Sequence, residues 1–348
     1  MDTIRLTVDK ENPGIAALEP AAAVLRRGGL VAFPTETVYG LGANGLDPQA
    51  VAGIYRAKGR PSDNPLILHI ADEESIHKLA KEVPANAARL MDAFWPGPLT
   101  IIFERTPSVP DIVTGGLHSV AVRLPDSQVA RELIRLAGIP LAAPSANTSG
   151  RPSPTTAQAV LDDLNGRINM VIDAGPCDIG VESTVVDCTT PVPTLLRPGG
   201  ITLEQLLTVL GEVEVDPSLA GEDAVPRSPG MKYTHYAPGA PMKLIEAPYP
   251  QLAEILRRET KAALAAGRTV GAVVSAETAE LLGPDVIVSV YGAKTDKQEI
   301  AARLYEALRF FDTHPVDLIY AEGVDEAGMG LAIMNRLRKA AGYEIIDS

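Results

Sequence analysis

Residues 30–47 read Leu-Val-Ala-Phe-Pro-Thr-Glu-Thr-Val-Tyr-Gly-Leu-Gly-Ala-Asn-Gly-Leu-Asp, and this stretch decides the kind of fold. Its apolar start, residues 30–34, predicts a buried strand. The glycines Gly40, Gly42 and Gly45 satisfy the pattern G-x-G-x-x-G. In a dinucleotide-binding fold that pattern follows a strand directly, and an acidic residue stands about 20 residues further on. Here PTETVYG intervenes and the acid is absent, so the stretch predicts a different sheet with a polar cluster after the strand.

Outward from this stretch, short β-branched runs alternate with Ala- and Leu-rich stretches between residue 20 and about residue 225. The predicted strands cover residues 30–34, 66–70, 99–103, 120–123, 141–143, 170–173, 184–187 and 194–197. The predicted helices cover residues 15–27, 48–57, 73–81, 85–94, 127–137, 156–164 and 203–210. This alternation is typical of an α/β or α+β domain.

A second unit begins near residue 242, as expected for 348 residues, which exceed the usual size of one core. Its predicted strands are 242–245, 269–275, 285–290 and 318–322, and its predicted helices are 249–266, 297–312 and 331–341. This rhythm predicts a small, doubly wound parallel sheet. The proline-rich segment 214–241 between the units is too long for an ordinary loop. We therefore expect domains at 1–213 and 242–348, joined by a functional linker at 214–241.

The chain is acidic, with 31 Lys and Arg against 44 Asp and Glu and a formal charge of -13. Bulk charge of this sign disfavours stable binding to nucleic acid or to an anionic membrane. No long apolar run or signal-peptide core is present, so we expect a cytoplasmic protein. Cys177 and Cys188 are interpreted as ordinary thiols. The five histidines are scattered, and we expect no protein-ligated metal.

Four cations, Lys58, Arg60, Arg123 and Arg197, lie near predicted strand ends in this acidic chain. Each has a structural alternative: Lys58 and Arg60 follow a predicted helix, whose dipole they would offset. Ser145 and Asn147 could likewise only build a turn. Together, however, they favour an anionic ligand, because ligands of open α/β sheets bind outside the carboxyl ends of the strands. A nucleotide fits because Arg and Lys bind phosphate and Ser and Asn bind phosphate or base.

At least eight ordered motifs resemble the threonylcarbamoyl-AMP synthase family, in its long two-domain form. They are FPTETVYGLG, KGRP.DNPL, PGPLT, VAVRLP, APSAN.SG.PSPT, ESTVVD, LLRPG and the linker SPGMKYTHYAP, with GMGLAIMNRLRKAAG near the end. The resemblance implies a twisted-sheet α/β domain with a large concave cationic cleft, followed by a small Rossmann-like domain. It implies that L-threonine, bicarbonate and ATP, with Mg2+ held mainly by the phosphates, give threonylcarbamoyl-adenylate and pyrophosphate. Partner proteins would then transfer the threonylcarbamoyl group to tRNA next to the anticodon.

The resemblance also implies site residues. The catalytic pair would be Lys58 and Arg60. The ATP set would be Lys58, Arg60, Asn64, Ser119, Ala143, Ser145, Asn147, Ser153, Arg197 and a linker tyrosine, Tyr233 or Tyr236. The threonine set would be Thr37, His69, Arg123 and Ser183.

Within the set that the resemblance implies, the residue types suggest physical roles. Arg123 would hold the threonine carboxylate in its fork, and Thr37, His69 and Ser183 would read the hydroxyl. No general base is evident in the sequence, and the linker would act as a lid over a hydrolysable product. The alternative function is an RNA-binding module, which the acidic charge and the 4% aromatic content disfavour.

Overall fold

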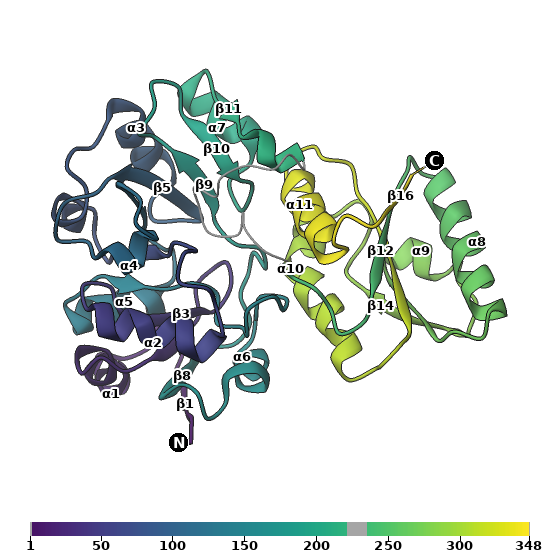
Figure 1. Ribbon diagram of the computed structural model, residues 1–348, viewed down its shortest axis with the longest axis horizontal. Coiled ribbons are helices and arrows are strands. Elements are labelled where there is room, and N and C mark those ends of the chain that lie inside the picture. The colour runs from purple at the N-terminus through teal and green to yellow at the C-terminus, as the bar shows by residue number, and fades with distance from the viewer. Residues whose placement is uncertain (1, 221–234, 348) are drawn as a thin grey trace. The chain divides into compact units, whose positions relative to one another are not determined.

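The computed structural model describes residues 2–220 and 235–347 (Figure 1). Contacts between Cα atoms divide them into two compact units, which are described separately below. The first contains most of the residues up to 220. The second contains residues 235–347 and two short segments, Gly150–Pro152 and Ile179–Val181.

The first unit is built on one mixed sheet, which has eleven strands in the described part of the chain. The order across the sheet is β1-β8-β2-β3-β7-β4-β6-β5-β9-β10-β11. In chain order the strands are β1 (Ile4–Thr7), β2 (Val31–Phe33), β3 (Gly40–Asn44), β4 (Ile67–His69), β5 (Leu99–Glu104), β6 (Ser119–Arg123), β7 (Leu141–Ala142), β8 (Met170–Asp173), β9 (Thr184–Asp187), β10 (Thr194–Arg197) and β11 (Glu214–Val215). Parallel and antiparallel pairs alternate irregularly, so strand starts and strand ends meet at the same edge.

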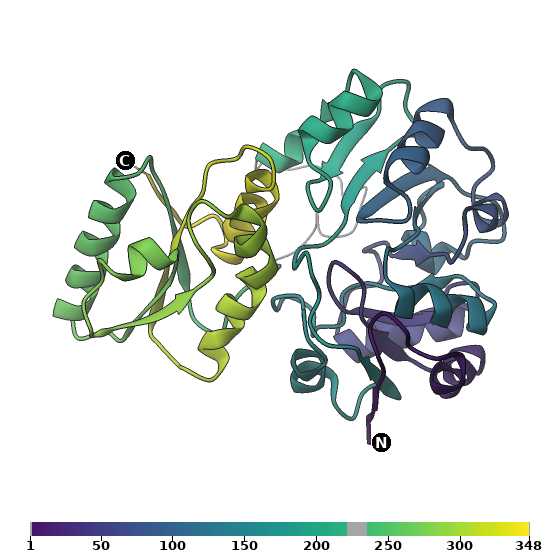
Figure 2. The same ribbon diagram turned by 180° about the vertical axis from the view of Figure 1, so that it is seen from behind.

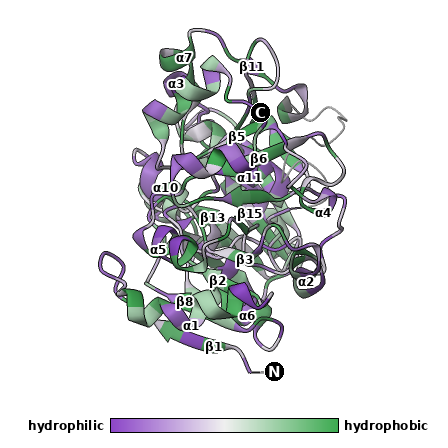
Figure 3. Cartoon of the chain, turned by 90° about the vertical axis from the view of Figure 1, so that its left-hand side faces the viewer, coloured by the Kyte–Doolittle hydropathy of each residue, from purple (hydrophilic) through white to green (hydrophobic). Residues whose placement is uncertain are grey.

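Helices cover this sheet because their apolar stripes need a partner surface. They are α1 (Ile15–Arg26), α2 (Pro48–Lys58), α3 (Ala85–Phe94), α4 (Asp111–Thr114), α5 (Gln128–Ala137), α6 (Ala157–Leu164) and α7 (Leu203–Leu210), with 3-10 turns η1 (Glu73–Lys78) and η2 (Pro217–Ala220). Helices α1 and α5 lie side by side in Figures 1 and 2 and bury Leu18, Leu25, Leu133 and Ile134 against strands β2, β7 and β8. Figure 3 shows hydrophilic and hydrophobic residues on the same helices, α1 among them.

Strand β3 was not predicted, because its glycines are unfavourable in strands. It pairs antiparallel with β2, so Gly42 lies opposite Val31. A Cβ atom at Gly42 would lie 2.8 Å from the Phe33 ring and 3.2 Å from the Val31 carbonyl oxygen. The G-x-G-x-x-G stretch is therefore a tightly packed strand and not a phosphate loop, which agrees with the rejection of a dinucleotide site.

The first residues of the predicted linker also extend this sheet. Strand β11 pairs parallel with β10, and the Asp216 amide donates to the Leu195 carbonyl at 3.0 Å. The short strand satisfies backbone groups along the β10 edge. The predicted linker thus begins inside the first unit, and its residues 221–234 lie outside the described part of the chain.

The second unit is a parallel sheet covered on both faces, as predicted. Its order is β14-β13-β15-β12-β16. The elements are β12 (Met242–Glu246), α8 (Gln251–Ala265), β13 (Val270–Val274), α9 (Ala276–Ala279), β14 (Val286–Val290), α10 (Lys297–Arg309), η3 (Phe310–Asp312), β15 (Leu318–Glu322), α11 (Gly330–Ala340) and β16 (Ile345–Asp347). Val270, Ala272 and Val274 pack with α8, whereas Gly271 on the other face meets the Phe311 ring. Figures 1 and 2 show α10 and α11 together on the side opposite α8.

None of the described helices is both long and apolar enough to cross a membrane. Cys177 and Cys188 are buried free thiols. Burial raises the pKa of both thiols, that of Cys188 to about 12. Neither is therefore a thiolate at neutral pH, and a nucleophilic role for either is disfavoured.

Candidate functional site

The register of the central strands places polar residues in one row across the sheet of the first unit. His69 of β4 lies opposite Arg123 of β6, and Arg123 lies opposite Thr100 of β5. Directly opposed residues share a face of the sheet. The Thr100 and Ser183 hydroxyls are 2.8 Å apart, and Arg197 at the end of β10 donates to Ser183 Oγ at 3.1 Å. We call His69, Arg123, Thr100, Ser183 and Arg197 the polar row.

Next to the polar row, the same region of the sheet carries a small apolar cluster. Two positions away along a strand, a side chain returns to the same face. Ile67 and Ala121 lie two positions before His69 and Arg123, and Ile102 lies two positions after Thr100 on the antiparallel strand β5; the three pack with Val185 and Leu196. A ligand lying along this face would therefore meet charges at the polar row and apolar surface beside it.

Strand ends explain only part of the arrangement. His69, Arg123 and Arg197 are last residues of their strands, as the carboxyl-end argument predicts. Ser119, however, is the first residue of β6, and Ser183 precedes β9. The carboxyl-end argument does not hold for Ser183, because the sheet is mixed, whereas Ser119 was implied by the family resemblance alone. A common face, and not a common strand end, unites the residues of the polar row.

His69 is a neutral, buried imidazole. Burial, and then the positive charge of Arg123, lower the pKa of His69 to about 3. Its Nδ1 atom has no hydrogen-bond partner among the described residues. A neutral ring with an unused nitrogen suits a hydrogen bond to an uncharged group such as a hydroxyl.

Arg123 is held by three neighbours in the PTETVYG and PGPLT segments. Its Nη1 donates to Thr37 Oγ1 at 2.9 Å and its Nε donates to the Gly97 carbonyl at 3.2 Å. Its Nη2 lies 2.6 Å from Glu36 Oε1, and both side chains are nearly inaccessible, at 4% and 9% exposure. Thr37, His69 and Arg123 are thus brought together as predicted, whereas Glu36 is an additional charge.

A close backbone approach fixes Ser183 and Arg197. The Arg197 guanidinium donates to the Ser183 carbonyl from Nε at 3.0 Å and from Nη2 at 2.9 Å. A Cβ atom at Gly199 would lie 2.2 Å from the Glu182 carbonyl oxygen and 2.4 Å from the Thr184 nitrogen. The LLRPG motif therefore needs glycine to bring Arg197 onto the EST segment. Arg197, a predicted nucleotide-binding residue, thus contacts Ser183, a predicted threonine-binding residue.

The Lys-x-Arg and Ser-x-Asn motifs meet in space. Helix α2 ends at Lys58, and Gly59 takes the left-handed cap with φ 63°. The buried Lys58 ammonium donates to the Ser145 carbonyl at 2.5 Å and to the Asn147 carbonyl at 2.6 Å. Ser145 in turn donates to Asn147 Oδ1 at 2.5 Å. Lys58 therefore orders the turn that contains Ser145 and Asn147, as the structural alternative for these two residues suggested. The same contacts place three predicted nucleotide residues, Lys58, Ser145 and Asn147, side by side.

The remaining predicted nucleotide residues lie around this turn and the adjoining strands. Arg60 Nη2 donates to the Pro65 carbonyl at 3.1 Å. Asn64 is buried, and its Oδ1 has no hydrogen-bond partner within the described ranges. Ser153 donates to the buried Glu182 at 2.5 Å, and the Ala143 amide donates to the Ile67 carbonyl at 3.0 Å.

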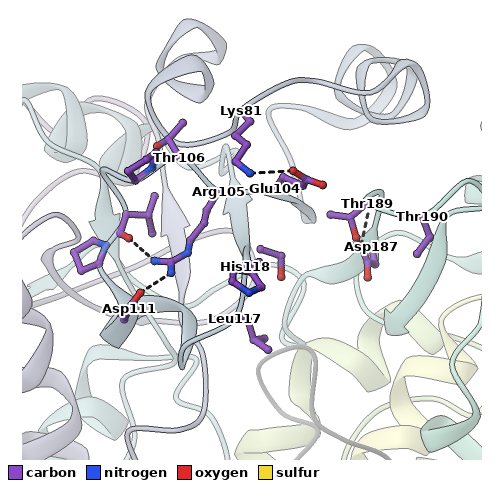
Figure 4. Close-up of a pocket in the computed structure, with 14 residues that line it drawn as sticks. Lys81, Glu104, Arg105, Thr106, Asp111, Leu117, His118, Asp187, Thr189 and Thr190 are labelled. Carbon is purple, nitrogen blue, oxygen red and sulfur yellow. Dashed lines mark hydrogen bonds and ion pairs between the residues drawn. The ribbon is translucent and has the colours of Figure 1, made fainter.

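Ser119 borders an open hollow of about 1100 Å³ in the first unit (Figure 4). The cations that Figure 4 shows here are paired with acids: Lys81 with Glu104 at 3.2 Å and Arg105 with Asp111 at 2.5 Å. Ser119 lies opposite Glu104 and four residues before Arg123, or about 13 Å along the strand. The hollow therefore adjoins the end of the face that is distant from the polar row.

Of the two linker tyrosines, Tyr236 lies in the described part of the chain. Tyr233 lies outside the described residues. Tyr236 belongs to the second unit, where it is buried with φ 65°, and its ring stacks on Tyr305 at 5.3 Å. The Arg336 guanidinium lies 5.7 Å from the same ring.

The described residues contain no cluster of three or more His, Cys, Asp or Glu side chains that could hold a metal ion. The donor set of the candidate site is instead cations, hydroxyls and amides. Such a set fits an anion whose own oxygens carry a divalent cation.

Comparison with known proteins decides the family. A family profile described as "Telomere recombination" (Sua5_yciO_yrdC) matches residues 23–199. A second, described as "Threonylcarbamoyl-AMP synthase, C-terminal domain", matches residues 201–342. The chain is 50% identical to a Bacillus subtilis threonylcarbamoyl-AMP synthase, over 94% of this chain and 93% of that protein. The chain belongs to the threonylcarbamoyl-AMP synthase family.

Solved structures of this family agree with the fold. Pyrococcus abyssi Sua5 in complex with L-threonine superposes with a TM-score of 0.95 and 47% identity, covering 99% of this chain and 100% of that one. A P. abyssi Sua5 variant with alanine in place of a histidine and the next tyrosine superposes with a TM-score of 0.94. The predicted resemblance and the long two-domain form are thereby confirmed. Escherichia coli YciO is similar in fold, with a TM-score of 0.54 and 23% identity over 59% of this chain.

Glu36 and Glu182 were not among the predicted site residues. Both are buried carboxylates that contact predicted residues, Arg123 and Ser153 respectively. A signal was present in the sequence, because each stands as a single acid inside an otherwise uncharged motif, PTETVYG or VESTVV. Burial of an acid beside an arginine is a tertiary property, however, and the motif alone does not give it.

Proposed function

We propose that this chain joins L-threonine, bicarbonate and ATP to give L-threonylcarbamoyladenylate, pyrophosphate and water. Support comes from likeness along nearly the whole chain to synthases from B. subtilis and P. abyssi, the latter 49% identical over 94% of both chains. The P. abyssi protein has been solved with L-threonine, the amino acid that this reaction requires.

The polar row is the observation that carries the proposal for this chain. Arg123 presents a planar fork suited to a carboxylate. Thr37 contacts that fork, and His69 lies beside it as a neutral ring. Ser183 contacts Thr100, which lies opposite Arg123 in the sheet. We assign threonine's carboxylate to Arg123 and its hydroxyl to Thr37, His69 and Ser183.

The nucleotide is assigned to the Lys58 turn and its surroundings. Lys58 and Arg60 would meet the phosphates, while Asn64, Ser119, Ala143, Ser145, Asn147 and Ser153 would bind the sugar, base or phosphates. Arg197 and a linker tyrosine, Tyr233 or Tyr236, complete the set. The substrate would be MgATP, whose Mg2+ neutralises charge on the phosphate oxygens.

The chemistry then depends on bringing two anions together. A carbamate formed on threonine's amine must attack the α-phosphorus of ATP, and both groups are negative. Cations fixed before the reaction stabilise the charge that gathers there, and a single donor of this kind is worth about 3–4 kcal/mol. Lys58 and Arg60 are proposed for this role, while Arg123 orients the amino acid.

The product is a mixed anhydride, and a tRNA threonylcarbamoyl-transferase system is the proposed acceptor downstream. An acidic chain of charge -13 fits a protein that serves tRNA modification through a small-molecule product.

Mass spectrometry with 13C-labelled bicarbonate tests the proposal. The pure protein with ATP, threonine and the label should form an adenylate that carries one additional mass unit. Absence of the labelled adenylate, together with salt-dependent retention of labelled tRNA without nucleotide, would instead support an RNA-binding function.

A further inference from the structure

The buried ion pair of Glu36 and Arg123 has hydrogen-bonding capacity that other described residues of the protein do not use. Arg123 Nη2 lies 2.6 Å from Glu36 Oε1. Yet neither Glu36 oxygen, nor Arg123 Nη2, has a hydrogen bond of acceptable geometry within the described residues. An ionised carboxylate can accept several hydrogen bonds. Arg123 Nη1 and Nε are engaged by Thr37 and Gly97, but Arg123 Nη2 and both Glu36 oxygens keep hydrogen-bonding capacity that a ligand could use.

Such a pair contributes little to stability. Burial removes water from both charges, and their attraction compensates this loss only when further hydrogen bonds satisfy the remaining groups. Removing one partner alone would leave the other charge buried without compensation. A ligand that separates Glu36 from Arg123 must therefore bring a positive charge for Glu36 as well as a negative charge for Arg123.

A free amino acid meets this requirement because it is a zwitterion. We propose that Glu36 binds the ammonium group of L-threonine, while Arg123 turns from Glu36 to the threonine carboxylate. This inference rests on the proposed function, and it adds a ligand group that the predicted threonine set lacked. The exchange replaces one buried ion pair by two and leaves the net charge of the site unchanged.

The surroundings of Glu36 favour a cation. Asp126, an exposed residue, stands close enough that the Glu36 charge raises the Asp126 pKa, after the larger effect of burial. Arg131 lies 3.7 Å from Asp126. Thr37, which follows Glu36 in the chain, already contacts Arg123. The ammonium site would thus lie directly beside the carboxylate site.

Ligand analogues test the proposal without altering the protein. (R)-3-Hydroxybutanoate keeps threonine's carboxylate and hydroxyl but lacks the ammonium, and L-threoninamide keeps the ammonium but lacks the carboxylate. By calorimetry, each should bind the full-length wild-type protein at least about tenfold more weakly than threonine, because each leaves one buried charge unpaired. Equal binding of threonine and hydroxybutanoate would overturn the proposal.

Glu36→Gln separates binding from a merely structural role. The variant should lose threonine affinity by about tenfold or more and should bind hydroxybutanoate more tightly than the wild type, because no carboxylate remains to be stranded. ATP affinity should stay within about threefold, and Glu82→Gln, at an exposed acid, should leave all ligands unaffected. Equal losses for threonine and hydroxybutanoate would overturn the proposal and make Glu36 only a support for Arg123.

The same binding experiments distinguish a failure of the proposed function from a failure of the proposal for Glu36. If the chain is not a threonine-dependent synthase, the wild type binds neither threonine nor its analogues. If it is a synthase but Glu36 has no ligand role, the wild type binds threonine and Glu36→Gln binds it equally well. Glu36→Asp, which keeps the charge, should recover part of the threonine affinity if the proposal holds.

Discussion

At the residue scale, the chemistry of the site depends on which charges are present at neutral pH. His69 contributes none, because burial and Arg123 hold its pKa at about 3. Arg123 contributes a permanent positive charge that Glu36 balances. The site therefore combines the balanced ion pair of Arg123 and Glu36, the further cation Arg197 and neutral hydrogen-bonding groups. Such a set suits an amino acid with a hydroxyl side chain that lies beside a second, anionic substrate.

His69 makes the stability of the protein depend on pH with a defined sign. Its folded pKa of about 3 lies below the usual value near 6.5, so the unfolded chain binds the proton first as pH falls. The contribution of the neutral ring is fully present above about pH 6.5 and declines toward pH 3. Between pH 6 and pH 5 the wild type should lose about 1 kcal/mol relative to His69→Asn, measured by urea unfolding. Parallel curves for both proteins would contradict the buried neutral ring.

Lys58 and Arg60 should be the most sensitive cations. Alanine at either position should lower turnover by about 100-fold or more, because a fixed donor at the phosphates is lost. Arg56→Ala is the matched control, since Arg56 is an exposed cation on the same helix α2. Near-normal turnover in both variants would remove Lys58 and Arg60 from the catalytic machinery. Lys58→Ala should in addition lower the melting temperature, because Lys58 holds two carbonyl groups of the Ser145 turn.

At the scale of elements, the turns at residues 145–147 and at Gly199 position the side chains of the candidate site as much as the strands do. Most strands and helices could be predicted from periodicity, and the strands over residues 170–173, 184–187, 194–197 and 318–322 agree at both ends. Strand β3 could not, because four of its five residues are glycine, alanine or asparagine. Nor could the common face, because it follows from the strand order and register, which periodicity along one strand does not contain.

The Gly199 turn offers a test at this scale. Gly199→Ala would force a methyl group against the backbone of residues 182–184 and displace Ser183 and Arg197. We expect a loss of about 2–3 kcal/mol in the free energy of unfolding, together with weakened threonine binding. Gly283→Ala is the matched control, because no atom lies near its Cβ position. Equal stability of the two variants would show that the turn tolerates a side chain.

At the scale of the whole molecule, the chain combines a large mixed sheet with a doubly wound parallel domain. The doubly wound domain could be predicted from its alternating pattern, and the α/β or α+β class of the first unit likewise, whereas a twisted sheet in the first unit was implied by the family resemblance. Glu36 as a ligand group could not be predicted, because its role depends on burial beside Arg123, which lies 87 residues away.

Removal of the second unit tests whether the first suffices. Deleting residues 228–348 should sharply reduce the yield of adenylate, because the predicted linker and its tyrosines would no longer shield a hydrolysable anhydride from water. The measurement is the half-life and yield of the adenylate by chromatography, alongside the melting temperature of the shortened chain. Unchanged yield and half-life would contradict a shielding role.

The central claim is that one face of the first sheet binds threonine beside ATP and joins them through bicarbonate. Pyrophosphate release by the full-length protein tests it most directly, with each substrate omitted in turn. The account predicts release only when ATP, threonine and bicarbonate are all present, and its loss when hydroxybutanoate replaces threonine. Release that persists without threonine or without bicarbonate would contradict it.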